Sequence, residues 1–244
     1  MLTNANFLCE IGTEEIPAGY ISPAINSLKT LFSEKLTELR IDFSDIDVFA
    51  TPRRFAVLVS GMADAQRSEI IELKGPSEKA AYDSAGSPTK AMEGFLKGNG
   101  IDLKDTLLKD TDKGKYVFAS KKLSSEKTEK MIPEILESCL ANLQFPKRMK
   151  WSDKKLTFPR PIRYFVLMFN DRVVPFEIEG IKSGNCTRGH FVQFNKMIEI
   201  LKISDYRDLL RANGVILDQN ERKELIKKEL DCLSHPEQCP IRPE

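Results

Sequence analysis

The sequence predicts an α+β fold with mixed or antiparallel sheets and flanking helices. Three observations predict it. Short apolar runs have the length of strands, longer segments repeat apolar residues every three or four positions as amphipathic helices do, and the two kinds follow each other in irregular order. A parallel α/β fold would need strand and helix to alternate regularly. The 244 residues are also enough for two domains.

Residues 1–65 are expected to form an N-terminal strand-helix-strand unit. Apolar residues between positions 20 and 39 recur at helical spacing, and Ser22 with Pro23 suits the cap and first turn of that helix. Gly12 and the residues after it should end the first strand, and Pro52 stiffens a turn between the next two. The strands are expected at residues 7–11, 46–50 and 55–59.

Residues 66–145 are expected to be an inserted α+β segment. A strand at 70–73 should end where Gly75 and Pro76 turn the chain. Loop-like sequence then surrounds a short helix near 91–96 and a glycine-containing turn. A strand at 116–121 and an amphipathic helix at 126–143 complete the segment.

The remaining chain divides into a strand-rich basic segment, 146–200, and C-terminal helices with a tail, 201–244. Strands at 162–169 and 173–178 are joined through Asn170, Asp171 and Arg172, which have the composition of a hairpin turn. Two helices follow, with Gly214 as a C-terminal cap between them. These helices are expected at 205–213 and 218–233.

The charge of the chain is nearly balanced overall but not locally. With 37 basic and 36 acidic residues, the net charge is +1, which argues against a protein that is basic throughout. Residues 146–163 hold seven positive charges against Asp153 alone, and they surround Trp151. Basic side chains among aromatic rings can bind phosphates and stack on unpaired bases. The alternative is a solvated loop in which Trp151 anchors two domains.

Arg53 and Arg54 form a smaller basic cluster. Because Pro52 stiffens the turn before them, both guanidiniums are expected to project and to clamp a phosphate or a carboxylate of a partner. The alternative is that they pair with Glu14 and Glu15.

Catalytic, nucleotide and metal signatures are missing from the sequence. Glu14 and Glu15 have no histidine or metal-spaced partner nearby, and His190 has no nucleophile motif beside it. The chain has neither a phosphate loop nor a GxGxxG fingerprint. A metal site at Cys232, His235 and Cys239 would lack a clear fourth ligand. We therefore predict no catalytic residue and no metal on this chain.

The location of the protein is predicted to be cytoplasmic. No apolar run approaches the roughly 18 residues of a membrane span, and the first residues lack the pattern of a signal peptide. Five cysteines without CxxC spacing do not indicate a disulfide framework.

Six short motifs follow one another along the chain. They are Cys9-Glu10-Ile11-Gly12-Thr13-Glu14-Glu15-Ile16-Pro17, Phe49-Ala50-Thr51-Pro52-Arg53-Arg54-Phe55-Ala56, Lys74-Gly75-Pro76-Ser77, Phe145-Pro146-Lys147-Arg148-Met149-Lys150-Trp151, Phe158-Pro159-Arg160-Pro161-Ile162-Arg163 and Arg188-Gly189-His190. In this order they closely resemble the bacterial glycyl-tRNA synthetase β subunit, and the resemblance covers about residues 7–230. After His190, where family members usually have Arg, this chain has Phe191.

The resemblance implies a ligase subunit. The family works as an α2β2 heterotetramer that uses ATP to attach glycine to its tRNA. ATP and magnesium are then bound by the α subunit and not by this chain, while β supplies tRNA binding and assembly. The chain by itself is expected to be inactive.

The resemblance also implies a domain order. Family β subunits look related in part to the B3/B4-type domain of the phenylalanyl enzyme, followed by an HD-like domain and an anticodon-binding domain. Since this sequence stops at Glu244, it is expected to be the N-terminal portion, without anticodon recognition.

Seven basic residues are the predicted contacts with tRNA or with a partner. The alternative function is an assembly module that docks on the α subunit without touching RNA. An independent editing hydrolase would need a catalytic constellation that the sequence does not offer. The predicted contact residues are Arg53, Arg54, Lys147, Arg148, Lys150, Arg160 and Arg163.

Overall fold

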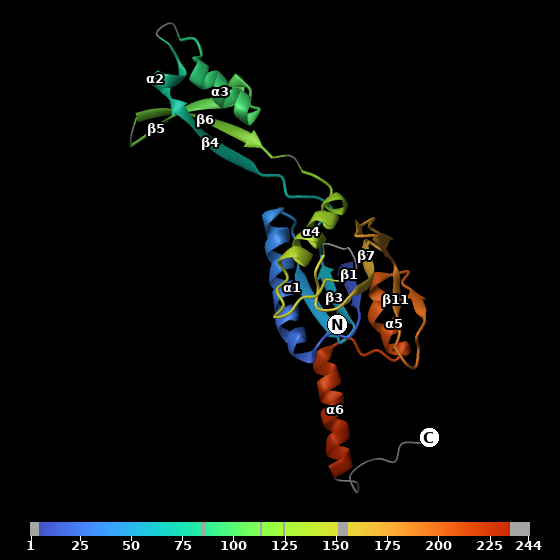
Figure 1. The fold of residues 1–244 in the computed structure, drawn as a ribbon. Coiled ribbons are helices and arrows are strands. Elements are labelled where there is room, and N and C mark those ends of the chain that lie inside the picture. Colours follow the sequence, from blue (N-terminus) through green and yellow to red (C-terminus); the bar gives the residue numbers. More distant parts are fainter. Residues whose placement is uncertain (1–4, 84–85, 113, 124, 151–155, 235–244) are drawn as a thin grey trace. The chain divides into compact units, whose positions relative to one another are not determined.

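A computed structural model describes residues 5–83, 86–112, 114–123, 125–150 and 156–234. The chain divides into two compact units (Figure 1). The first comprises residues 1–66 and 127–244, and the second comprises residues 67–126. The helix at residues 128–142 belongs to the first unit.

A seven-stranded sheet is the centre of the first unit. Its order is β2-β3-β1-β7-β10-β9, and β8 pairs with β7. All pairs are antiparallel except β7 with β10, as an α+β fold predicts. The strands are β1 (Ala5–Thr13), β2 (Asp45–Thr51), β3 (Arg54–Ser60), β7 (Ile162–Phe169), β8 (Arg172–Val173), β9 (Glu177–Ile178) and β10 (Ile181–Gly184).

The predicted turn between β7 and β8 is confirmed. Asn170 and Asp171 have positive φ angles of 48° and 60°, as the favoured two-residue hairpin turn requires. The strand expected at 173–178 is instead divided into β8 and β9, with Val174, Pro175 and Phe176 between them. Pro175 has no N–H to donate to a neighbouring strand.

Two helices cover one face of the sheet. They are α1 (Ala18–Glu38) and α4 (Thr128–Asn142), which pack together in the same core. Side chains alternate across a strand, so every second residue of β1 faces these helices. Phe7, Cys9 and Ile11 are all buried there.

The opposite face of the sheet is covered by the C-terminal part of the unit. Leu8 and Met168 pack against the 3₁₀ turn η2 (Ile203–Asp205) and helix α5 (Tyr206–Ala212). A separate two-stranded sheet joins β11 (Cys186–Arg188) to β12 (Met197–Glu199). Gly214, with φ of 75°, ends α5 as predicted, and α6 (Gln219–Ser234) follows.

The second unit is a three-stranded antiparallel sheet with short helices. Its strand order is β4-β6-β5, and its small core contains Ala81, Met92 and Val117. Gly100 in the left-handed conformation ends α3. The elements are β4 (Ile70–Ser77), α2 (Glu78–Ala81), α3 (Lys90–Asn99), η1 (Leu103–Asp105), β5 (Thr106–Thr111) and β6 (Gly114–Lys122).

Other element predictions were wrong as well. Helix α1 begins at Ala18 and contains Pro23, because its first turn also packs against the core through Tyr20 and Ile21. Strand β4 continues through Pro76 to Ser77, since a register shift after Lys74 accommodates a residue without an N–H.

Strand β5 was not predicted, because neighbouring Leu107 and Leu108 are both exposed and give no alternating pattern.

Within the described residues, no helix has an apolar stretch long enough to span a membrane.

Candidate functional site

Glu10 is a fully buried carboxylate at the centre of the main sheet. It lies on β1, opposite Ala56 of β3 and Val166 of β7. Because it alternates with Cys9 and Ile11, its side chain is on the face that packs against η2 and α5. A buried carboxylate must be paired and hydrogen-bonded to be tolerated there.

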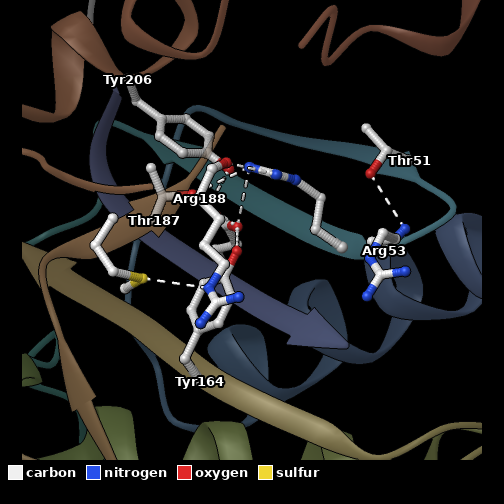
Figure 2. Close-up of polar contacts among 9 residues, drawn as sticks. Thr51, Arg53, Tyr164, Thr187, Arg188 and Tyr206 are labelled. Carbon is white, nitrogen blue, oxygen red and sulfur yellow. Dashed lines mark hydrogen bonds and ion pairs between the residues drawn. The ribbon is translucent and has the colours of Figure 1, made fainter. Parts of the chain in front are cut away.

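Four side chains from distant parts of the chain satisfy this carboxylate (Figure 2). The hydroxyls of Tyr164 and Tyr206 donate to its two oxygens at 2.6 Å each, from opposite sides of the cluster. The Thr187 hydroxyl lies 2.7 Å from Oε2, and Nη1 of Arg54 lies 3.2 Å from Oε1. This Glu10 cluster therefore joins β1, β3, β7, β11 and α5.

Gly12 makes room for the Glu10 cluster. It lies on the same face of β1, with Arg54 and Tyr164 as its register partners. A Cβ atom at Gly12 would lie 2.2 Å from atoms of the Tyr164 ring. The ring can cross the strand toward Glu10 only because position 12 has no side chain.

Burial and the charge of Glu10 shift the pKa values of the two tyrosines and the arginine around it. Burial and the charge of Glu10 raise the pKa of both Tyr206 and Tyr164, so both phenols remain neutral donors. Burial by itself lowers the pKa of Arg54, but the charge of Glu10 and the nearby tyrosines more than offset this, and the net shift is upward. Arg54 and Glu10 thus form an ion pair inside the protein.

The expectation that Arg54 projects from its turn was wrong. Its side chain is 4% exposed, and Nη2 donates to the carbonyl of Arg188 at 2.7 Å. Arg54 is the first residue of β3, and its side chain is on the face that carries Glu10. The alternative of pairing with Glu14 or Glu15 holds for Arg53, which pairs with Glu14, whereas Arg54 pairs with Glu10.

A second cluster surrounds Glu14, just beyond the end of β1. Its carboxylate forms ion pairs with Arg53 and with Arg163, whose Nε lies 2.8 Å from Oε1. The Arg53 guanidinium also lies 3.9 Å from the centroid of the Phe191 ring. Figure 2 shows Arg53 apart from the Glu10 cluster, with its backbone N–H bonded to the hydroxyl of Thr51. This Glu14 cluster is partly exposed.

Both clusters contribute to the wall of one pocket of about 660 Å³. Its charged lining residues are four arginines and one glutamate, so positive charge dominates it. Ligand sites in proteins usually have volumes of about 300–1,000 Å³. The charged residues of this arginine pocket are Glu14, Arg53, Arg54, Arg163 and Arg188.

The other predicted contact residues do not line the arginine pocket. Lys147 and Lys150 are exposed, and Arg148 is half-buried with Nη2 donating to the carbonyl of Leu140 at 3.2 Å. Arg160 donates from Nε to the carbonyl of Glu15 at 3.0 Å. Trp151, Lys154 and Lys155 lie outside the described residues.

Sequence reasoning missed several residues of the site. A glutamate inside an apolar strand-length run was the available signal for Glu10, because such a residue needs a buried partner. Thr187 and Tyr206 gave no local signal, since only the tertiary fold brings them to β1. From the sequence, Arg188 was only one residue of a family motif and was not predicted to be a contact residue.

No metal site is evident in the described part of the chain, where no group of three or more histidine, cysteine, aspartate or glutamate side chains could hold an ion. The sequence spacing Cys232, His235 and Cys239 was weighed as a metal site. Of these three residues, His235 and Cys239 lie outside the described residues.

Comparison with known proteins identifies the family. A family profile described as "Glycyl-tRNA synthetase beta subunit" matches residues 7–243. The chain is 38% identical over 229 residues to the glycine–tRNA ligase beta subunit of Desulfitobacterium hafniense (strain Y51), covering 94% of this chain and 33% of the relative. It is 39% identical over 222 residues to that of Clostridioides difficile (strain 630), covering 91% and 32%.

The beta subunit of Solidesulfovibrio magneticus is 38% identical over 231 residues, which covers 94% of this chain and 33% of the relative. The chain thus spans about a third of the length of the curated relatives that it matches. The profile match across almost all of the sequence confirms the resemblance that the motifs indicated: the chain belongs to the glycyl-tRNA synthetase beta subunit family.

Proposed function

We propose that this chain works as part of a glycine–tRNA ligase beta subunit and contributes tRNA binding and assembly, while the chemistry of charging takes place on the α subunit. The relatives are glycine–tRNA ligase beta subunits, which supports the ligase assignment. ATP and magnesium act on the α subunit in this proposal, within an α2β2 enzyme of the cytoplasm. Aminoacylation of glycine tRNA is the reaction of the whole assembly.

One observation carries the tRNA-binding role. Arginines from separate segments, Arg53, Arg163 and Arg188, surround one pocket, although they are far apart in the sequence. Most contacts of proteins with nucleic acids go to phosphate and sugar, and arginine matches phosphate geometry with two parallel hydrogen bonds. Lys147 and Lys150 of the same unit are exposed cations that are available to a phosphate.

A second candidate function is assembly with the α subunit without RNA contact. Apolar side chains between β11 and β12 are exposed, with Phe191 50% and Val192 79% exposed. Phe194 and Met197 add to this surface at 40% and 49%. Contiguous exposed apolar surface is typical of protein interfaces.

The double variant Lys147→Gln/Lys150→Gln tests the tRNA-binding role in the complete beta subunit assembled with α. Both lysines are exposed, so their replacement removes charge without disturbing the core. We expect weaker tRNA binding and a log–log salt slope reduced by about 0.7–0.9 for each lost phosphate contact. The measurement is tRNA affinity by filter binding at several salt concentrations.

The matched control is Lys79→Gln/Lys97→Gln, which removes two exposed lysines from the second unit. Equal affinity and equal salt slope in the two double variants would contradict a tRNA contact at Lys147 and Lys150. Loss of α binding in the Lys147/Lys150 variant with unchanged salt slope would instead support the assembly function.

A further inference from the structure

The arginine pocket contains more positive charge than its own acidic groups neutralise. Arg54 is balanced by buried Glu10, and Glu14 is shared between Arg53 and Arg163. The Arg188 side chain contacts Sδ of Met197 at 3.3 Å and has no carboxylate partner within the described residues. Two positive charges therefore remain at the pocket, which favours an anionic ligand such as a phosphate group.

Part of the pocket wall is held in place before any ligand binds. Arg54 donates to the carbonyl of Arg188, and Arg188 pairs with Met197 in the β11–β12 ladder, so its backbone is fixed. The guanidinium of Arg163 contacts Glu14 through Nε. Because Arg54 and the backbone of Arg188 need little reordering, less entropy opposes ligand binding.

The wall of the pocket also contains polar atoms that the protein leaves unpaired. Oγ1 of Thr13 and Nε of Arg54 are buried and have no hydrogen-bond partner among the described residues. Both residues line the pocket, and both are only 4% exposed. Unpaired buried polar atoms are uncommon in proteins, and these two belong to residues that form the wall of the pocket.

We propose that the arginine pocket binds the phosphate group of a ribonucleotide, with Arg163 and Arg188 as its principal ligands. The volume of about 660 Å³ accommodates a nucleotide, and the rings of Tyr164 and Phe191 line the same pocket beside the charge. The phosphate belongs either to an RNA chain or to a free nucleotide. This inference rests on the proposed function for its RNA source, but not for the phosphate chemistry.

The test compares cytidine 5′-monophosphate with cytidine, because the two probes differ only by the phosphate. Calorimetric titration uses the complete beta subunit with α, and a cytidine nucleotide avoids the ATP site proposed for α. We expect the wild type to bind the monophosphate more tightly than the nucleoside. In the variant Arg163→Gln/Arg188→Gln this preference should fall at least about tenfold, because two charged hydrogen-bonding groups are lost.

The matched control is Arg172→Gln/Lys202→Gln, which removes two exposed cations of the same unit that do not line the pocket. Its effect should stay within about twofold, because salt screens distant surface charges. The affinity of each variant for glycine tRNA is measured across salt concentrations. Loss of the pocket arginines should reduce the log–log slope by about 0.7–0.9 relative to the control.

The outcomes distinguish an RNA phosphate from a free nucleotide, and they distinguish failure of the phosphate site from failure of the proposed tRNA-binding function. Loss of tRNA affinity with the reduced slope supports an RNA phosphate, whereas loss of the monophosphate preference alone supports a free nucleotide. If neither measurement distinguishes Arg163→Gln/Arg188→Gln from the control, the phosphate site is overturned. A tRNA response to Lys147 and Lys150 in that case leaves the proposed function standing.

Discussion

Two glutamates four residues apart in the sequence, one on β1 and one just after it, pair with arginines and yet have opposite surroundings. Glu10 lies inside the sheet with 0% exposure and pairs with Arg54, which is 4% exposed. Glu14 lies just past the strand and is 33% exposed, and its partners Arg53 and Arg163 are 28% and 62% exposed. The same chemistry is therefore structural in one cluster and available to a ligand in the other.

The difference follows from solvation. Charges taken out of water must be fully paired, so removing one partner from a buried pair leaves the other uncompensated. Exposed pairs are solvated and screened, and their rearrangement costs little. The Glu10 cluster should thus resist change, while the Glu14 cluster can exchange an internal carboxylate for an incoming anion.

Glu10→Gln should reduce the stability of the fold more than any other single substitution in the two clusters. The substitution keeps the shape of the side chain but removes the charge that balances Arg54, and we expect a loss of about 3–5 kcal/mol in the free energy of unfolding. Urea unfolding monitored by circular dichroism measures it. A loss no larger than that of Glu14→Gln would show that the buried pair does not stabilise the fold.

Tyr206→Phe should cost about 1.5–3 kcal/mol at neutral pH, because Glu10 loses one charge-assisted hydrogen bond. The same variant should alter alkaline unfolding. Folding raises the pKa of Tyr206 above its ordinary value of 10, so its contribution is fully present below pH 10 and falls as the pH rises further.

The alkaline decline attributed to Tyr206 is at most about 1.4 kcal/mol per pH unit. Urea unfolding between pH 8 and pH 11 should show a shallower decline in Tyr206→Phe than in the wild type. Buried Cys139, whose pKa is raised to about 12, and Tyr164 contribute in both proteins and so cancel in the comparison. Parallel curves would exclude titration of Tyr206 as a cause.

Gly12→Ala should cost about 1–3 kcal/mol, because the new methyl group displaces the Tyr164 ring from its bond to Glu10. Gly19→Ala is the control, since a Cβ there meets no atom within 4 Å. Thermal unfolding of both variants is the measurement. A tolerated alanine at position 12 would show that Tyr164 can reach Glu10 by another path.

Glu14→Gln should have the smallest effect, within about 1 kcal/mol of the wild type, because its ion pairs are partly exposed and solvated. Urea unfolding at low and high salt measures it, and the small loss should shrink further as salt rises. A loss of several kcal/mol would show that the Glu14 cluster is as structural as the Glu10 cluster.

The sequence predicted the main elements wherever local pattern matched tertiary surroundings. Helical spacing of apolar residues correctly indicated most of α1 and α4, and the Asn170–Asp171 turn followed from residue preference for positive φ. Pro23 and Pro76 were misleading because a proline usually marks the boundary of an element. Packing against the core extends α1 on the N-terminal side of Pro23, and a register shift lets β4 continue through Pro76.

For the candidate site, the motifs indicated the family and the importance of the turn that carries Arg53 and Arg54, because these depend on residue identity alone. They did not show that Arg53 is partly exposed while Arg54 is buried. That outcome depends on strand register and on the helix α5 that covers one face of the sheet. Only the tertiary structure brings Tyr206 and Thr187 to Glu10, since hydrogen bonds across more than 170 residues leave no local pattern.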